Sequence, residues 1–187
     1  MIPPLIIRPL GDLPACELQR LGAADIEEMA GHCRNLFDDG TWCAAAVERS
    51  LAPPGCVALL ARTAGQAAGL VLARVVADEC EILWLVVLTL WRRRGIGRNL
   101  LQAALRTAAG LGANTAYLEV AETNRAAIEL YGAEGFQPCG RRRAYYGSGR
   151  EGEACNALLY KRALAPGETC LPQSAVNCAN ISEAEIK

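Results

Sequence analysis

The segment Arg92–Arg98, RRRGIGR, contains the residue types that point most directly to chemistry. It follows an apolar run, EILWLVVL, and is followed by a helical pattern, NLLQAALRTAAG. A strand that ends in a glycine-rich turn and opens a helix presents unpaired backbone N–H groups at the positive end of the helix dipole. Glycines let phosphate oxygens approach those groups, and arginines can add charge-assisted contacts. The segment therefore predicts a binding site for a phosphate or diphosphate group.

Two well-known phosphate loops fit this segment incompletely. The P-loop requires a lysine followed by serine or threonine after its second glycine, and this chain has an arginine and an asparagine there. The dinucleotide fingerprint GxGxxG fits at Gly95 and Gly97 but has Leu100 in place of the third glycine. Glu119 closes the next predicted strand about where a ribose-binding acid would lie. A nucleotide-binding oxidoreductase is therefore one alternative that the residues leave open.

The composition limits the classes of protein that need considering. The 187 residues are 52% apolar, which is enough to fill the core of one domain. A net charge of −1 gives no overall basic field for nucleic acid or an anionic membrane. The nine cysteines are odd in number and contain no CxxC pair, so we expect neither disulfides nor a metal site, and most cysteines as small buried residues. Without a signal-peptide pattern or a long apolar run, we expect a cytoplasmic protein.

The elements that must position the RRRGIGR segment alternate along the chain, which predicts an α/β fold. We expect an edge strand at LIIRPL, helices at about 23–37 and 41–51, a hairpin around Gly65, and a fully buried strand at EILWLVVL. The helix after the segment should bury one face formed by Leu101, Ala104, Leu105 and Ala108. A strand AYLEV, a capped helix TNRAAIELYGAEG and a closing pair of strands, GFQPCG and ACNALLYKRAL, should follow. Residues 1–164 form the predicted domain, and residues 165–187 a loose tail.

The RRRGIG motif also fits a third phosphate loop, and here the resemblance extends beyond the loop. It resembles the pyrophosphate loop of the GNAT-family N-acetyltransferases, whose signature is Gln or Arg, two residues, Gly, one residue, then Gly or Ala. LEVAETNRAAIELYGAEGF resembles the next strand and helix of the family, in particular those of RimI-type enzymes, which acetylate the N-terminal alanine of a small-subunit ribosomal protein. The resemblance is close from Leu83 to about Leu164 and departs at VLTLW, where close relatives carry Asp-Pro. It implies a central mixed β-sheet flanked by helices, with acetyl-CoA as the acetyl donor.

The resemblance also implies which residues would bind acetyl-CoA. Backbone groups of a splayed strand would bind the pantetheine arm, backbone N–H groups of the loop would surround the pyrophosphate, and one asparagine would contact the cofactor as well. These are, in the same order, Leu85, Val86 and Val87; Arg93, Arg94, Gly95, Ile96, Gly97 and Arg98; and Asn124.

Acetyl transfer to an amine needs a base, and the sequence offers a carboxylate for it. The only histidine, His32, lies in the first predicted helix and is interpreted as structural. In AYLEV, strand alternation places Tyr117 and Glu119 on one face and the apolar residues on the other. A buried carboxylate in such a strand is costly unless it is paired or partly wet, and burial would favour base chemistry. Glu119 matches the RimI-type general base, with Glu122 in reserve; a salt-bridged glutamate on an exposed edge strand is the alternative.

The departing thiolate needs an acid, and the resemblance assigns this role to Tyr131. An aromatic residue near the end of a helix, as in ELYGAEGF, is more often part of the core. A phenol with a reference pKa of about 10 is protonated at neutral pH, and a thiolate with a pKa of about 8.5 needs a proton to depart cleanly. Tyr131 is therefore the candidate general acid of a direct transfer.

The acceptor predicted from the resemblance is the α-amine of a protein N-terminus, most specifically an N-terminal alanine of a ribosomal protein. The stretch RRRAYYGSGREGE would form a loop over the acceptor groove, with Tyr145 and Tyr146 bonding to the peptide backbone. Asp38 and Asp39 would draw the ammonium inward, or else be solvated turn acids. The alternatives are acetylation of a lysine side chain or a small molecule, and a non-catalytic acyl-CoA sensor.

Overall fold

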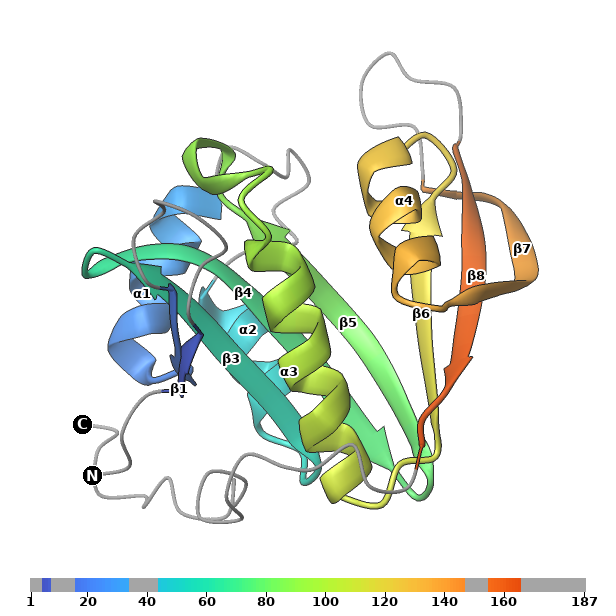
Figure 1. Ribbon diagram of the computed structural model, residues 1–187, viewed down its shortest axis with the longest axis horizontal. Helices are drawn as coiled ribbons and strands as arrows, with labels where there is room; N and C mark the ends of the chain where they lie inside the picture. The colour runs from blue at the N-terminus through green and yellow to red at the C-terminus, as the bar shows by residue number, and fades with distance from the viewer. Residues whose placement is uncertain (1–4, 8–15, 34–43, 147–154, 166–187) are drawn as a thin grey trace.

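The computed structural model describes residues 5–7, 16–33, 44–146 and 155–165, whose strands form one mixed eight-stranded sheet. The elements are β1 (Leu5–Ile7), β2 (Cys16–Arg20), α1 (Ala23–Cys33), α2 (Ala44–Leu51), β3 (Cys56–Thr63), β4 (Gln66–Val76), β5 (Glu79–Val87), the short 3-10 helix η1 (Thr89–Trp91), α3 (Ile96–Gly110), β6 (Thr115–Ala121), α4 (Arg125–Ala133), β7 (Gln137–Tyr146) and β8 (Cys155–Ala163). The strand order is β1-β2-β3-β4-β5-β6-β8-β7 (Figure 1). The pair β5–β6 is parallel and the other neighbouring pairs are antiparallel.

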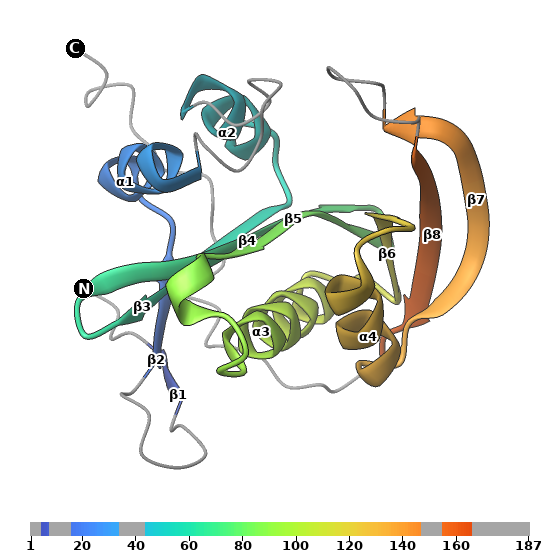
Figure 2. The same cartoon turned by 90° about the horizontal axis from the view of Figure 1, so that it is seen from above.

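Helices cover the two faces of the sheet in different places. Helices α1 and α2 lie on one face and α3 and α4 on the other (Figure 2). The predicted apolar face of α3 is confirmed, because its four residues are at most 1% exposed: Leu101, Ala104, Leu105 and Ala108. The alanines let the helix approach β3, β4 and β5 closely. Among the described residues, the half of the sheet formed by β6, β8 and β7 has α4 on one face and no helix on the other, which is called the open face below (Figure 2).

Most of the predicted elements are present. The LIIRPL segment supplies β1 at the edge of the sheet, and β3 and β4 form the predicted hairpin. The predicted helices correspond to α1 and α2, although residues 34–37 and 41–43 lie outside the described part of the chain. The strand β2 was missed, because only Leu18 of its sequence CELQR is apolar enough to reveal an inward-facing position. The tail predicted from residue 165 lies, apart from Ala165, outside the described residues.

The prediction that EILWLVVL is fully buried is wrong. Ile82 and Val86 are buried, whereas Leu83, Trp84 and Leu85 are only partly so. The register explains this difference. Strand β5 pairs with β6 only from Glu79–Ile82, opposite Thr115–Leu118, so its second half has a neighbouring strand on one edge alone.

A β-bulge lies where β5 and β6 separate. Leu72 of β4 pairs with Trp84 and Ala73 with Ile82, which leaves Leu83 as an extra residue in β5. A bulge bends a strand and increases its local twist. Figure 1 shows β5 and β6 side by side where they begin and diverging toward their ends. The two strands therefore separate directly beyond Ile82 and Leu118, and this separation between β5 and β6 is called the cleft below.

An ion-pair cluster joins α1 to the sheet. The Nη2 atom of Arg62, in β3, lies 2.6 Å from Oδ1 of Asp25 and 2.6 Å from Oε2 of Glu28. Gln19 also donates to Asp25. The hydrogen bond from Arg62 is the largest cause that lowers the pKa of Glu28. Arg62 thus binds two acidic residues of α1 to strand β3.

We expect Arg62→Met to lower the free energy of unfolding by about 1 kcal/mol at pH 7, because Asp25 and Glu28 lose their shared cation in a partly screened setting. The lowered pKa of Glu28 contributes stability above the unfolded-state pKa of about 4.3, and this contribution disappears as pH falls through the folded-state pKa. The difference between wild type and variant should therefore narrow between pH 7 and pH 3.5, measured by urea unfolding.

The matched control is Arg74→Met, since Arg74 pairs with Glu81 at 3.2 Å and both side chains are about half exposed. This control should change the free energy of unfolding by less than about 0.5 kcal/mol. If Arg62→Met lowered the free energy of unfolding by the same amount at pH 7 and pH 3.5, the stabilising role of the Arg62 ion pairs would be contradicted.

Candidate active site

The cleft between β5 and β6 presents unpaired backbone groups. Along an antiparallel pair, the backbone groups of successive residues point alternately toward the partner strand and away from it. From Leu83 to Val87, β5 pairs with β4 alone, so the groups that point away face the cleft. This is the edge that binding of a pantetheine arm by Leu85, Val86 and Val87 requires; the contacts themselves stay a prediction. The carbonyl of Val87 already accepts a hydrogen bond from Nε of Arg92 at 3.0 Å.

The loop after β5 forms a row of backbone N–H donors. Gly95 is the N-cap of α3 with φ +79°, its helix has no side-chain cap, and Arg93 also has a positive φ of 62°. The first intrahelical hydrogen bond of α3 runs from the N–H of Asn99 to the carbonyl of Gly95, at 3.0 Å. The N–H groups of Ile96, Gly97 and Arg98 therefore lie in the first turn, where no intrahelical acceptor is available. Left-handed residues before a helix make the concave arrangement that binds anions.

The arginine side chains of this loop mainly hold the loop itself. Arg92 bonds to the carbonyl of Val87, and the guanidinium of Arg94 lies 5.1 Å from the centre of the Trp91 ring. Nε of Arg98 lies 2.8 Å from Oε1 of Glu134, the residue that follows α4. In this conformation the triplet Arg92–Arg94 does not point as a whole toward a diphosphate. The side chains of Arg92 and Arg94 contact the protein itself. The donors available to the predicted anion site are therefore mainly backbone N–H groups.

Gly97 lies where the loop, β5 and α4 meet. A Cβ atom at this position would lie 3.4 Å from Cγ2 of Val87 and 3.5 Å from Cδ2 of Leu130. Hydrogen in place of a side chain therefore leaves the first turn of α3 open toward the cleft. The residues present fit a diphosphate carried by an arm that runs along β5, as acetyl-CoA would require.

Asn124 has a structural role in addition to the predicted one. It is the N-cap of α4, and its Oδ1 accepts a hydrogen bond from the N–H of Ala127 at 3.2 Å. This bond confirms that the TNRAAIELYGAEG helix is capped. Contact between Asn124 and the cofactor stays a prediction, for which its amide NH₂ is the available donor.

Glu119 lies at the mouth of the cleft, one residue beyond the last β5–β6 pair. The predicted alternation is confirmed, because Leu118 and Val120 are buried while Tyr117 and Glu119 are partly exposed. The Glu119 side chain is 24% exposed and its Oε1 lies 3.0 Å from Nη1 of Arg142, so the carboxylate is both paired and partly wet, the condition that the sequence set for a carboxylate in this strand. The alternative was a salt-bridged glutamate on an exposed edge strand. The salt bridge is present, but β6 is not an edge strand, because it lies between β5 and β8.

Glu122, the reserve base, is held by three hydrogen bonds. It accepts from Arg141 at 2.6 Å and from the side-chain and backbone nitrogens of Asn156 at 2.5 and 3.4 Å. The bond from Arg141 is the main cause that lowers the pKa of Glu122. A carboxylate with a lowered pKa and occupied oxygens is a weak base, so Glu122 serves instead to join the ends of β6, β7 and β8.

Tyr131 lies in the last turn of α4 and is 7% exposed. Its ring centroid is 5.9 Å from that of Phe136, so it packs in the core as aromatic residues at this position usually do. The same turn approaches the start of α3, where Leu130 would contact a Cβ at Gly97 and Glu134 pairs with Arg98. The candidate acid therefore belongs to the element that closes the cleft beside the loop.

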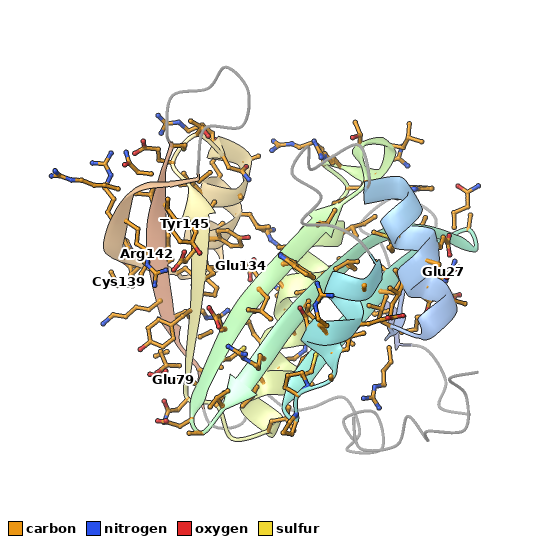
Figure 3. The ribbon with its side chains drawn as sticks, turned by 180° about the vertical axis from the view of Figure 1, so that it is seen from behind. Glu27, Glu79, Glu134, Cys139, Arg142 and Tyr145 are labelled. Carbon is orange, nitrogen blue, oxygen red and sulfur yellow. The ribbon has the colours of Figure 1, made fainter. Side chains whose placement is uncertain are left out.

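The open face of the sheet contains a hollow of about 390 Å³ next to Glu119. Its lining comes from five strands: Arg74, Val76, Glu79, Cys80, Glu81, Tyr117, Leu118, Glu119, Arg142, Leu159 and Tyr160. Figure 3 shows this face, with Arg142 and Tyr145 near each other and Glu79 at its far end. An acceptor that reached Glu119 from this face would meet the cleft from the side opposite α3 and α4.

The RRRAYY segment is part of strand β7 and not of a loop, which corrects the prediction. From Arg141 to Tyr146 the chain has no glycine, proline, asparagine or aspartate, and β7 runs on to Tyr146, which pairs with Cys155 after an irregularity in the register between Arg142 and Tyr146. Tyr145 is 51% exposed and lies under the guanidinium of Arg142. The side chain of Tyr146 lies outside the described residues, as do Asp38, Asp39 and the side chain of His32.

Among the described residues, no group of three His, Cys, Asp or Glu side chains could hold a metal ion. Cys56 and Cys80 are buried thiols as expected, whereas Cys139 is exposed. Burial raises the pKa of Cys80 to about 12, which keeps it protonated and inert. In the described part of the chain, no helix is long and apolar enough to cross a membrane.

Comparison with known proteins agrees with this geometry. Residues 22–136 match the family described as Acetyltransferase (GNAT) family. The chain is 35% identical over 141 residues to the N-alpha-acetyltransferase RimI of Mycobacterium tuberculosis, covering 73% of this chain and 83% of that protein. It is 36% identical over 96 residues to the ribosomal protein bS18-alanine N-acetyltransferase of Escherichia coli K12, covering 50% of this chain and 65% of that protein.

Solved structures show the same fold. The crystal structure of the ribosomal-protein-S18-alanine N-acetyltransferase from Escherichia coli superposes with a TM-score of 0.69 at 25% identity, over 80% of this chain and 94% of that chain. Ard1 from Thermoplasma volcanium has a TM-score of 0.69 at 22% identity, over 80% of this chain and 98% of that chain.

A mixed sheet whose β5 and β6 separate beside a glycine-rich turn is the architecture of the acetyltransferases to which these comparisons show similarity. The chain belongs to the GNAT acetyltransferase family, and it is an enzyme of the N-acetyltransferase class. The oxidoreductase alternative drawn from the GxG motif is therefore wrong.

Replacing Gly97 with valine tests the anion loop. The new side chain would extend from a Cβ already in contact with Val87 and Leu130 into the opening toward the cleft. We expect the dissociation constant for acetyl-CoA to rise at least tenfold, equivalent to about 1.4 kcal/mol, as measured by isothermal titration calorimetry.

The matched control is Gly132→Val, because Gly132 lies in α4 and a Cβ atom added there would meet nothing within 4 Å outside its own helix. This control should bind acetyl-CoA as the wild type does. Unchanged affinity in a folded Gly97→Val protein would remove the phosphate-loop interpretation.

Proposed function

We propose that this protein transfers the acetyl group of acetyl-CoA to the α-amine of a protein N-terminus, specifically the N-terminal alanine of a ribosomal protein, in the cytoplasm. The observation that carries the proposal is the position of Glu119, whose carboxylate lies where the cleft between β5 and β6 meets the hollow of the open face. The names of the relatives from Mycobacterium tuberculosis and Escherichia coli support the choice of an N-terminal α-amine.

In this proposal the two faces of the sheet hold the two substrates. Acetyl-CoA supplies an acetyl group activated as a thioester. The N–H groups from Arg93 to Arg98 bind its diphosphate, and the open edge of β5 at Leu85 and Val87 orients the pantetheine arm, because the backbone groups of Val86 point toward β4. An N–H of this edge also stabilises the oxyanion that forms when the amine adds to the thioester carbonyl.

Glu119 is proposed as the general base. Its carboxylate is partly exposed on the side from which the acceptor arrives, and it accepts the proton that the amine nitrogen releases as the N–C bond forms. The lowered pKa of Glu122 and its three hydrogen bonds make that residue the weaker candidate. Glu119 therefore takes the proton, and Arg142 lies beside it.

Tyr131 is proposed as the general acid. As the C–S bond breaks, its phenol donates a proton to the departing sulfur, which keeps the thiolate from adding back. Tyr131 is buried in the last turn of α4, whose Leu130 lies near Gly97 at the start of α3, and this supports a donor on the side of the sheet that the cofactor would occupy. The acid and the base thus come from opposite sides of the cleft.

The choice of an α-amine rests on proton affinity. An α-amine has a reference pKa of about 7.7 to 8.0 and lysine about 10.4, so freeing the lone pair at pH 7 costs the lysine more than about 3 kcal/mol extra. A single carboxylate base suits the α-amine better. Tyr145, exposed at the end of β7, and Tyr146 beside it are proposed to bond to the backbone of the acceptor peptide.

We expect Glu119→Gln and Tyr131→Phe each to lower kcat by about 10²-fold or more, the usual scale of acid–base assistance, with nearly unchanged affinity for acetyl-CoA. Steady-state kinetics with a peptide that begins with alanine and calorimetric binding of acetyl-CoA would measure the two effects. Glu129→Gln, an exposed carboxylate on α4, is the control that should keep the wild-type rate. Full rates in both variants would show that other residues perform these steps.

Competition between two acceptors tests the proposed substrate. One peptide begins with a free alanine and lacks lysine; the other has the same sequence with a blocked N-terminus and one internal lysine. We expect acetylation, followed by mass spectrometry, almost entirely on the α-amine, because far more of it is neutral at pH 7. Equal or greater transfer to lysine would favour the lysine alternative, and absence of transfer despite binding of acetyl-CoA would favour a sensor.

A further inference from the structure

The ion pair between Glu119 and Arg142 spans three strands. Glu119 belongs to β6 and Arg142 to β7, and β8 lies between them. Glu119 pairs in register with Leu159, and Arg142 with Ala157. Because Leu159 and Ala157 are two residues apart, all four side chains belong to the same face of the sheet. The small side chain of Ala157 leaves room for the guanidinium to cross β8 and reach the carboxylate at 3.0 Å.

A second contact holds Arg142 in this position. Its guanidinium carbon lies 5.3 Å from the centre of the Tyr145 ring, within the range of a cation–π interaction (Figure 3). The Arg142 side chain is 54% exposed and also lines the hollow. A fixed positive charge therefore lies beside the proposed base at the surface that an acceptor must cross.

The other charged and titratable groups around the hollow come from β4, β5, β6 and β8: Arg74, Glu79, Cys80, Glu81, Tyr117 and Tyr160. Arg74 pairs with Glu81 at 3.2 Å, so these two charges offset each other. Desolvation is the first cause that raises the pKa of Tyr117, followed by Glu79, to which its hydroxyl bonds. Burial raises the pKa of Cys80 to about 12. Among the described residues, the cation paired with Glu119 is Arg142.

We propose that Arg142 determines which amine is acetylated, by neutralising Glu119 so that the site accepts the acceptor amine in its uncharged form. This inference rests on the proposed function. A carboxylate without a cation would attract any ammonium group, including that of lysine. A carboxylate already paired with a guanidinium does not, and the guanidinium repels an arriving ammonium.

The free amine fraction then decides between acceptors. At pH 7 about a tenth of an α-amine is neutral, but only about one lysine in 2,500, from reference pKa values of about 8 and 10.4. A site that takes only the neutral form therefore favours the α-amine on the order of 250-fold before any other contact is made.

Every bond and proton of the acetyl transfer is accounted for without Arg142. The nitrogen lone pair forms the N–C bond, the proton that the nitrogen then releases passes to Glu119, and the C–S bond breaks as the sulfur takes the proton of Tyr131. Arg142 touches neither the bond that forms nor the bond that breaks. It is a specificity-determining residue that acts through the charge of Glu119.

The experiment measures kcat/KM between pH 6 and 8.5 for the two peptides described above, one with a free N-terminal alanine and one with a blocked N-terminus and a lysine. Wild type should show kcat/KM for the α-amine rising nearly tenfold per pH unit from about pH 6 and levelling near pH 8. In Arg142→Gln the profile should flatten below about pH 7.5, the KM for the lysine peptide should fall, and the α-amine to lysine ratio of kcat/KM should drop at least about tenfold.

Two further variants separate charge from structure. Arg142→Lys keeps a cation and should stay within about threefold of the wild-type ratio. Arg143→Gln removes a neighbouring exposed arginine that forms no ion pair within the described residues, and should leave ratio and profile unchanged. A loss of selectivity in Arg142→Lys equal to that in Arg142→Gln would overturn the charge argument.

The outcomes distinguish this inference from the function on which it rests. Transfer by the wild type with a flat profile from pH 6 to 7.5 overturns the inference alone, even if Arg142→Gln does not fold. An unchanged ratio in a folded Arg142→Gln protein does the same. Absence of transfer to either peptide by the wild type removes the proposed function and the inference together.

Discussion

The end of hydrogen bonding between β5 and β6 is the constraint on which the rest of this structure depends. The two strands pair in parallel from Glu79–Ile82 and then separate, at the level where Leu83 bulges out of the β4–β5 ladder. Inside a sheet, backbone groups without a partner are costly, and they are tolerated where water or a ligand can satisfy them. The separation therefore produces both an opening and a line of donors and acceptors along β5.

The elements around this opening lie on the two faces of the sheet. On one face, α3 starts beside the end of β5 with N–H groups that a diphosphate can occupy, and α4 approaches it through Leu130 and Glu134. On the other face, which α1 and α2 leave partly uncovered, Glu119 and Arg142 border a hollow (Figure 3). A strand with alternating side chains makes this division possible, because Leu118 and Val120 are buried while Glu119 lies on the opposite, partly exposed face of β6.

Local patterns predicted much of the fold and some of the site. The helical face of α3, the β3–β4 hairpin, the cap at Asn124 and the alternation around Glu119 all follow from short-range periodicity or from residue types next to one another. Long-range pairing was harder to predict. The apolar run EILWLVVL resembles a strand with neighbours on both edges, yet half of it has one neighbour, because apolar composition does not record where a partner strand ends.

The sequence by itself determined that a glycine-rich turn opens α3 and that Glu119 lies on the face of β6 opposite its buried neighbours, because both features depend on residues within a few positions of each other. Only the tertiary structure decided what surrounds them. Glu119 and Arg142 are far apart in the chain, and they meet because β8 inserts between β6 and β7 and carries the small Ala157 at the crossing. The arginines of the loop likewise fold onto Val87, Trp91 and Glu134, since the packing of η1 and α4 brings acceptors and a ring within reach. Side-chain charges act over distances that the order of strands sets, and that order is a property of the folded chain.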